Sequence, residues 1–305
     1  MRFIHNNNLS DPCMNLALEE FCLQNPNMTE DYVLFYINAP SVIIGKHQNP
    51  FEECNFAFLQ NNDIQLVRRI SGGGAVYHDN GNLNFSFITG FKKEKLDYFQ
   101  KLIQPILRAL HRLGVPAEIT EKNNIVVEGK KASGNSHYTN IHRMLSHGTL
   151  LFDSDLDVLE TALRSNLEIV KSKAVQSARS EVTNISDHTG QPGHISVLRE
   201  KLMNAVSEQF GELNKHALSG RDWDTIYRLA EDKYKSWDWT FGRSPDFVVR
   251  HVVQYEGDLI ECCMQVRHGV INAISNHDKP REDAAIEALE SKFIGQRYSE
   301  VQFQI

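Results

Sequence analysis

The sequence has 305 residues, 41% of them hydrophobic, which is enough for one large domain and a small one. The formal net charge of −7 argues against a nucleic-acid-binding surface, which needs concentrated Lys and Arg over a broad face. The N-terminus has no apolar segment of the signal-peptide or membrane-spanning kind, so we expect a cytoplasmic protein without a membrane partner.

The first part of the chain alternates helical and strand-like stretches. An Asp-Pro pair followed by spaced apolar residues predicts a short amphipathic helix over 11–21. Apolar residues at helical spacing predict a second helix over 95–113, which ends before Gly114. β-branched and aromatic runs predict strands at 32–37, 41–44, 64–70 and 83–88.

The following residues continue this mixed order. The Glu128-Gly129 pair predicts a turn between two short strands. Gly190 to Gly193 predict a loop before the second of three further helices. The strands are expected at 125–127, 131–133 and 144–152, and the helices at 156–163, 196–210 and 223–234. The sequence therefore predicts an α+β protein.

The pattern changes after the aromatic stretch 237–242. Strands are expected around the Glu256-Gly257-Asp258 and His268-Gly269 turns, followed by a helix over 281–293. We place a domain boundary near Gly242, which divides the chain into a larger domain at 1–242 and a smaller one at 243–305.

The positions of the basic residues and the cysteines indicate which kinds of binding site the chain can form. Basic side chains gather at Arg68-Arg69, at Lys130-Lys131 and over 171–179, which on an acidic protein favours a pocket for a small phosphorylated ligand. The five cysteines are too few and too irregularly spaced for a disulfide framework, and we expect reduced thiols that mostly pack.

The densest chemical signal is a glycine-rich block over 68–79, Arg-Arg-Ile-Ser-Gly-Gly-Gly-Ala-Val-Tyr-His-Asp. Consecutive glycines let backbone N–H groups approach a ligand, and a neighbouring arginine can neutralise a phosphate. The block lacks the Gly-Lys-Ser/Thr of a Walker loop, and predicted strands flank it, unlike a dinucleotide motif that opens a helix. It predicts a cradle for an anion and an adenine, with a flexible glycine hairpin as the alternative.

The second signal is the segment 123–135, where two lysines precede a small-residue loop. A lysine there can stabilise charge where a carboxylate meets a phosphate. Because side chains alternate along a strand, Lys130 and Lys131 point to opposite faces, and Lys131 shares its face with Ser133. The alternative interpretation is an exposed hairpin with two solvated lysines.

The order of several motifs decides between these interpretations. They comprise 11–20, 42–55, the glycine block, 129–134, His147-Gly148-Thr149-Leu150-Leu151, 179–184 and 237–242. In this order the chain resembles the lipoate-protein ligase A family of the biotin/lipoyl protein ligase superfamily. The resemblance covers nearly the whole sequence, and several ordered motifs are far more specific than any one of them.

The resemblance implies a fold and an activity. The fold is an α+β, biotin/lipoyl-ligase-like mixed sheet flanked by helices, which makes 1–242 the catalytic lipoyl-ligase domain and 243–305 a small α/β C-terminal accessory domain. The enzyme would use ATP, with substrate-bound Mg²⁺, to convert lipoic acid into lipoyl-AMP and pyrophosphate. It would then transfer the lipoyl group to a lysine of an acceptor, either the lipoyl domain of a 2-oxoacid dehydrogenase acyltransferase subunit or the glycine-cleavage H protein.

The resemblance also assigns site residues. Lys131 matches the catalytic lysine that touches the reacting carboxylate and the α-phosphate. The residues expected to bind ATP or the adenylate are Arg69, Gly74, Ala75, Val76, Tyr77, Asn123 and Lys131. Those expected to bind lipoate are Gly72, Gly73, Gly74, His78, Lys131, Ser133, Gly134, His147 and Gly148. For His78 and His147, lining the pocket and holding structure by hydrogen bonds remain alternatives, and their spacing does not support a metal site.

One departure from the family pattern concerns magnesium. The family often has Asn-Asp where this chain has Asn123-Asn124. Because Mg²⁺ prefers carboxylate oxygen, Asn124 puts a protein carboxylate ligand in doubt at the expected site. We expect phosphates and water to hold the ion.

Three other functions fit the sequence less well. An octanoyl or lipoyl transferase of this fold would need a cysteine that forms a thioester, and none lies between Asn123 and Phe152. A biotin ligase carries a different Gly/Arg-rich signature. A non-catalytic carrier-binding protein would not need both Lys131 and the glycine block. The sequence leaves open the preferred acceptor, the oligomeric state and the choice between lipoate and octanoate, because both acids fill an apolar tunnel by similar dispersion contacts.

Overall fold

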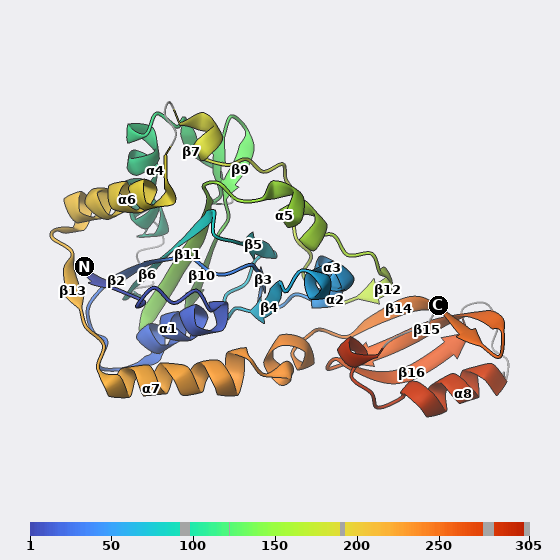
Figure 1. Ribbon diagram of the computed structural model, residues 1–305. Helices are drawn as coiled ribbons and strands as arrows, with labels where there is room; N and C mark the ends of the chain where they lie inside the picture. Colours follow the sequence, from blue (N-terminus) through green and yellow to red (C-terminus); the bar gives the residue numbers. More distant parts are fainter. Residues whose placement is uncertain (92–97, 122, 190–192, 277–283, 302–305) are drawn as a thin grey trace.

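A six-stranded mixed sheet forms the centre of the larger part of the protein (Figure 1). The computed structural model describes residues 1–91, 98–121, 123–189, 193–276 and 284–301. β1 is parallel to both of its neighbours, and the other pairs are antiparallel. Across the sheet the strands are β10 (Asn135–Thr139), β11 (Arg143–Leu151), β6 (Asn82–Gly90), β2 (Tyr32–Tyr36), β1 (Arg2–Ile4) and β13 (Asn214–His216). The predicted α+β fold with a mixed sheet is confirmed, whereas β1, β10 and β13 were not predicted.

Helices cover both faces of this sheet. In Figure 1, α4 (Tyr98–Arg112) and α6 (Ile195–Phe210) lie on one side, and α1 (Pro12–Gln24) lies on the other beside α7 (Gly220–Leu229). Because side chains alternate along a strand, β2 contributes to both cores, and all five of its residues are buried. Val33 and Phe35 of β2 pack with α4 and α6, and its remaining residues pack with α1.

Five of the six predicted helices recur as single helices with small changes at their ends. Residues 95–97 of the predicted 95–113 helix, 281–283 of the predicted 281–293 helix and 190–192 of the predicted loop lie outside the described residues. The predicted 223–234 helix is split into α7 and the π-helical turn η2 (Ala230–Tyr234). The shorter helical elements are α2 (Pro50–Glu53), α3 (Phe56–Asn61), α5 (Leu156–Ala162), η1 (Ser186–His188) and η3 (Asp238–Gly242). None of the helices in the described ranges is long and apolar enough to cross a membrane.

Helix α1 differs from its predicted amphipathic character. Its start agrees with the sequence, because the Asp11 side chain accepts a hydrogen bond from the Cys13 amide at 2.8 Å. Every residue from Pro12 to Leu23 is buried, however, so the amphipathic prediction is wrong. Glu19 and Glu20, which suggested a solvated face, are buried and bonded to residues far away in the sequence.

Two three-stranded sheets hold the motifs singled out in the sequence. One has the order β4 (Gln65–Arg68), β3 (Ser41–Ile44), β5 (Val76–His78), so the glycine block joins β4 to β5. The other has the order β7 (Ala117–Ile119), β8 (Ile125–Val127), β9 (Lys130–Ser133). Glu128 and Gly129 have φ values of 49° and 80°, which confirms the predicted tight turn between β8 and β9.

The C-terminal region forms its own four-stranded sheet with a helix against it (Figure 1). Its elements, in sheet order, are β12 (Glu168–Ser172), β14 (Phe247–Tyr255), β15 (Asp258–Arg267) and β16 (Val270–Asn276), followed in the chain by α8 (Ala284–Phe293) and η4 (Tyr298–Glu300). Both predicted turns in this region have positive φ values at their two central residues. β12 comes before Gly242 but pairs with β14, so the C-terminal sheet includes a strand from the first 242 residues.

Candidate active site

Two adjacent cavities lie where the glycine block, β9 and β11 meet. The larger has a volume of about 1010 Å³ and the smaller about 280 Å³. They meet at a common set of lining residues, Ala75, Val76, Lys131, Gly134, Thr149, Ser177 and Ala178. A long ligand could therefore lie with one end in each cavity and its reacting centre at this junction.

The glycine block is held in shape by Arg69. The buried Arg69 guanidinium donates to the carbonyl oxygens of Gly72 at 2.6 Å and Gly74 at 2.8 Å. Burial lowers the pKa of Arg69 to about 10, which still leaves a cation beside the smaller cavity at neutral pH. Gly73 has a φ of 87°, in the left-handed region that favours glycine. The loop thus keeps a backbone shape that other residues adopt poorly.

Lys131 lines both cavities. Its backbone is fixed on both sides, because its amide donates to the Glu181 carbonyl at 2.8 Å and its carbonyl accepts from the Thr183 amide at 3.0 Å. Burial and the nearby Arg69 lower the pKa of the Lys131 ammonium. Ser133 lines the larger cavity on the same face, as predicted, while Ala132 between them is in the core.

Lys130 is exposed, as predicted, and it contributes only to the lining of the larger cavity. The two lysines therefore differ in their access to the junction, where Lys131 alone of the pair is present.

Residues 176–182 form one wall of the larger cavity, and Ser177 and Ala178 among them also line the smaller one, which was not predicted. Ser177 Oγ accepts from the Ala75 amide at 2.9 Å and from Gln48 Nε2 at 3.0 Å. A Cβ on Gly74 would lie 2.8 Å from that oxygen, so glycine is needed there for the close approach. The basic residues of this segment predicted a role for it, but the contact is made by a serine that no sequence pattern marks.

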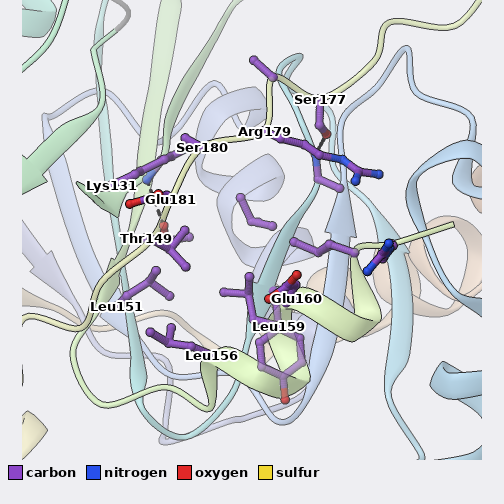
Figure 2. A pocket seen from close by; sticks show the side chains of 18 of the residues that line it. Lys131, Thr149, Leu151, Leu156, Leu159, Glu160, Ser177, Arg179, Ser180 and Glu181 are labelled. Carbon is purple, nitrogen blue, oxygen red and sulfur yellow. Dashed lines mark hydrogen bonds between the residues drawn. The ribbon is translucent and has the colours of Figure 1, made fainter. Parts of the chain in front are cut away.

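The larger cavity combines apolar and charged walls. Figure 2 shows Lys131 and Thr149 on one wall, α5 side chains such as Leu159 and Glu160 on another, and Arg179 on the crossing segment. Its cations are Lys130, Lys131, Arg164 and Arg179, and its acidic side chains are Glu52, Glu53, Asp157, Glu160 and Glu181. Apolar surface for a base and cations for phosphates are the features that a nucleotide needs.

A buried hydrogen-bond chain runs beside the smaller cavity. His147 Nδ1 lies 2.9 Å from Glu19 Oε2, and His147 Nε2 lies 2.7 Å from Ser71 Oγ. The Tyr36 hydroxyl donates to Glu19 Oε1 at 2.8 Å, and burial together with Glu19 raises the pKa of Tyr36 well above its ordinary value. His147 therefore both lines the cavity and, through Ser71, braces the start of the glycine block.

Most predicted site residues converge on these cavities. The smaller is lined by Arg69, Gly73, Gly74, Ala75, Val76, His78, Asn124, Lys131, Gly134, His147 and Gly148, and the larger by Tyr77 and Ser133 in addition to shared residues. Gly72 and Asn123 line neither cavity. The Gly72 carbonyl instead accepts from Ser136 Oγ at 2.9 Å, and the Asn123 carbonyl accepts from Asn135 Nδ2 at 2.5 Å.

Two of the three basic groups seen in the sequence, Arg68-Arg69 and 171–179, contribute only some of their basic side chains to the cavity linings. Arg68 is fully buried away from both cavities and donates to carbonyl oxygens near Gly45 and Thr240, so the expectation that it helps to bind phosphate is wrong. Lys171 and Lys173 are outside both cavity linings. In the described part of the chain no group of three or more His, Cys, Asp or Glu side chains is placed to hold a metal ion.

This fold and these joined cavities define the class of protein. The sequence profile of the Lipoyl protein ligase A/B catalytic domain matches residues 11–210. The chain belongs to the lipoate-protein ligase family. It is similar to lipoate-protein ligase LplJ of Bacillus subtilis (strain 168), with 40% identity over 300 residues that cover 98% of this chain and 91% of that protein.

Two solved structures show the same fold. One is a crystal structure of lipoate-protein ligase A bound with ATP, with a TM-score of 0.68 and 26% identity, covering 78% of this chain and 97% of that chain. The other is a bi-partite lipoate protein ligase from Thermoplasma acidophilum, described with its E2 lipoyl domain. It has a TM-score of 0.67 and 26% identity, covering 78% of this chain and 95% of that chain.

Proposed function

We propose that this chain is an ATP-dependent lipoate-protein ligase whose reaction takes place at the junction of the two cavities. Placement of the half-buried Lys131 at that junction is the observation that carries the proposal. The lipoyl chain occupies the smaller cavity, where Leu16 and Ile43 supply apolar surface. The nucleotide occupies the larger cavity, with its α-phosphate beside the lipoate carboxylate.

The first step forms an acyl-adenylate. A lipoate carboxylate oxygen attacks the α-phosphorus of ATP, the bond to the β-phosphate oxygen breaks, and pyrophosphate leaves. Negative charge accumulates between the two substrates during this step. The Lys131 ammonium is placed to stabilise that charge, and Arg69 holds the glycine loop beside it.

Magnesium is expected to arrive with ATP rather than to reside in the protein. Mg²⁺ in such sites uses substrate phosphates and water with one or two carboxylates. The acidic side chains that line the larger cavity match this chemistry, although Asn124 on the smaller cavity offers only an amide. Mg²⁺ would neutralise phosphate charge when it is bound.

The second step transfers the lipoyl group to a protein. The acceptor's lysine amine attacks the acyl carbonyl, an amide bond forms, and AMP leaves. We propose lipoyl domains as acceptors, in 2-oxoacid dehydrogenase acyltransferase subunits or in the glycine-cleavage H protein. We also propose that residues 1–242 carry the chemistry and that 243–305 form the accessory unit, whose sheet is completed by β12.

A cysteine-dependent transferase is the competing function. It would need a thiol beside the acyl group. Cys13, Cys22, Cys54 and Cys262 are buried, Cys263 is half-buried, and none of the five is among the residues that line the two cavities. Burial also raises the pKa of the Cys13, Cys22 and Cys54 thiols, which disfavours the reactive thiolate.

Exchange of labelled pyrophosphate into ATP tests the proposal. The purified protein should catalyse exchange that depends on lipoate and Mg²⁺, since adenylate formation is reversible. A transferase would give no exchange but would accept lipoyl groups from a carrier. Exchange that depends on biotin and not on lipoate would show that the chain is a biotin ligase and would contradict the proposal.

A further inference from the structure

A chain of buried asparagines fixes the direction of a hydrogen bond to His78. The Leu9 carbonyl oxygen can only accept, and it accepts from Asn15 Nδ2 at 3.0 Å. Asn15 Nδ2 also donates to Asn38 Oδ1 at 2.8 Å. Because the Asn38 oxygen faces Asn15, its Nδ2 faces His78 Nδ1 and donates to it at 2.9 Å.

This direction determines where the His78 proton lies. A ring nitrogen that accepts a hydrogen bond carries no proton, and a neutral imidazole carries one, so the proton is on Nε2. Burial, with the cations around it, lowers the pKa of His78 to about 3 and keeps the ring neutral. His78 is 4% exposed, and its Nε2 has no hydrogen-bond partner among the described residues. A buried donor is thus left without an acceptor.

His78 lies in the smaller cavity, which is proposed to hold the lipoyl chain, and not at the junction of the two cavities. It lines the smaller cavity and is absent from the lining of the larger. Asn84 on β6 lines the same cavity, and its buried Nδ2 also lacks a partner in the described ranges. By contrast, the Tyr36 hydroxyl and both His147 nitrogens there have partners. Two side chains with unpaired donors therefore line the smaller cavity and not its junction with the larger one.

We propose that His78 selects lipoate over octanoate by donating from Nε2–H to a sulfur of the dithiolane ring, with Asn84 as a second donor. This rests on the proposed function. Octanoate carries only hydrogen on the two carbons that bear sulfur in lipoate, and a C–H group cannot accept a hydrogen bond. Octanoate would therefore leave both donors unpaired, as they are in the free protein, whereas lipoate would supply an acceptor for them. Sulfur is a weak acceptor, so the preference is moderate.

Replacing His78 by phenylalanine removes the donor and keeps a ring of similar size. The ratio of kcat/KM for lipoate to that for octanoate, measured by pyrophosphate release, should fall about 5- to 30-fold in His78→Phe. The octanoate value should stay level or rise, because no unpaired donor remains. His142→Phe, at an exposed position away from both cavities, should keep the wild-type ratio. An unchanged ratio in a folded His78→Phe variant would overturn the proposal.

Nitrogen NMR of the wild-type protein with labelled histidine gives a second test that needs no variant. His78 should show a protonated Nε2 and an unprotonated Nδ1, and lipoate should shift the Nε2 signal more than octanoate does. An Nδ1–H tautomer, or equal shifts with both acids, would contradict the proposal. If the wild type activates neither acid, the proposed function fails, and the NMR result alone then decides whether His78 binds the ring.

Discussion

Arg68 and Trp239 hold each other by reciprocal hydrogen bonds. Arg68 Nε donates to the Trp239 carbonyl at 3.0 Å, and Trp239 Nε1 donates to the Arg68 carbonyl at 2.7 Å. The same guanidinium donates to Gln48 O at 2.6 Å and Thr240 O at 2.6 Å. Arg68 therefore joins the strand before the glycine block to the segment that leads into the C-terminal sheet.

Removing this guanidinium should destabilise the fold. Arg68→Met leaves several buried carbonyl oxygens without donors, and each unpaired group costs about 1–3 kcal/mol. We expect the free energy of unfolding, measured in urea, to fall by about 3 kcal/mol or more. Arg228→Met, at an exposed position on α7, is the matched control and should change it little. Equal stabilities of the two variants would show that the Arg68 contacts contribute nothing.

The shape of the glycine loop should be essential to activation. In Gly73→Val the new side chain meets an unfavourable φ of 87°, and its Cβ would lie 3.0 Å from Arg69 Nη2. Displacing the loop by an ångström should lower adenylate formation about 100-fold. Gly90→Val is the control, since a Cβ there meets nothing within 4 Å. Normal pyrophosphate release by a folded Gly73→Val variant would remove the loop from the mechanism.

Local patterns predicted much of this fold because they report local interactions. Residues 32–37 and 144–152 have the composition of buried strands, and the two-residue turns after Val127 and Tyr255 have the residues that positive φ favours. Strands β5, β7 and β10 were not predicted, because they mix polar and apolar residues and lack the β-branched run that marks the short strand β8.

The site features that were not predicted depend on contacts between segments that are far apart in the sequence. The Ser177 contact with Ala75 spans 102 residues, and the Glu19 contact with His147 spans 128. Arg68 and Arg69 are adjacent in the sequence and identical in type, yet only Arg69 reaches a cavity lining. Neighbouring residues on a strand face opposite ways, and the sequence does not specify which face another segment will cover.

The neutral state of His78 predicts a dependence of stability on pH. Its pKa is lowered from 6.5 to about 3 in the folded protein, so between these pH values the unfolded chain binds one more proton. The free energy of unfolding therefore falls as the pH is lowered through this window, by about 1.4 kcal/mol per pH unit for one group. His78→Phe should lose less stability than the wild type between pH 6 and pH 4, by roughly that slope, in urea titrations. His142→Phe should follow the wild type, and identical slopes for all three proteins would contradict a buried neutral His78.

Adenylate formation by two single-lysine variants tests the central claim most directly. Lys131 lines the junction of the two cavities and Lys130 does not, so Lys131→Ala should lower lipoate-dependent pyrophosphate exchange about 100- to 1,000-fold, by analogy with loss of one oxyanion donor. Lys130→Ala removes an exposed cation from the wall of the larger cavity and none from the junction, so it should lower exchange far less than Lys131→Ala does, with melting curves confirming that both variants fold. Loss of exchange in Lys130→Ala together with wild-type exchange in Lys131→Ala would contradict the strand register, the assignment of the two cavities and the catalytic role of Lys131.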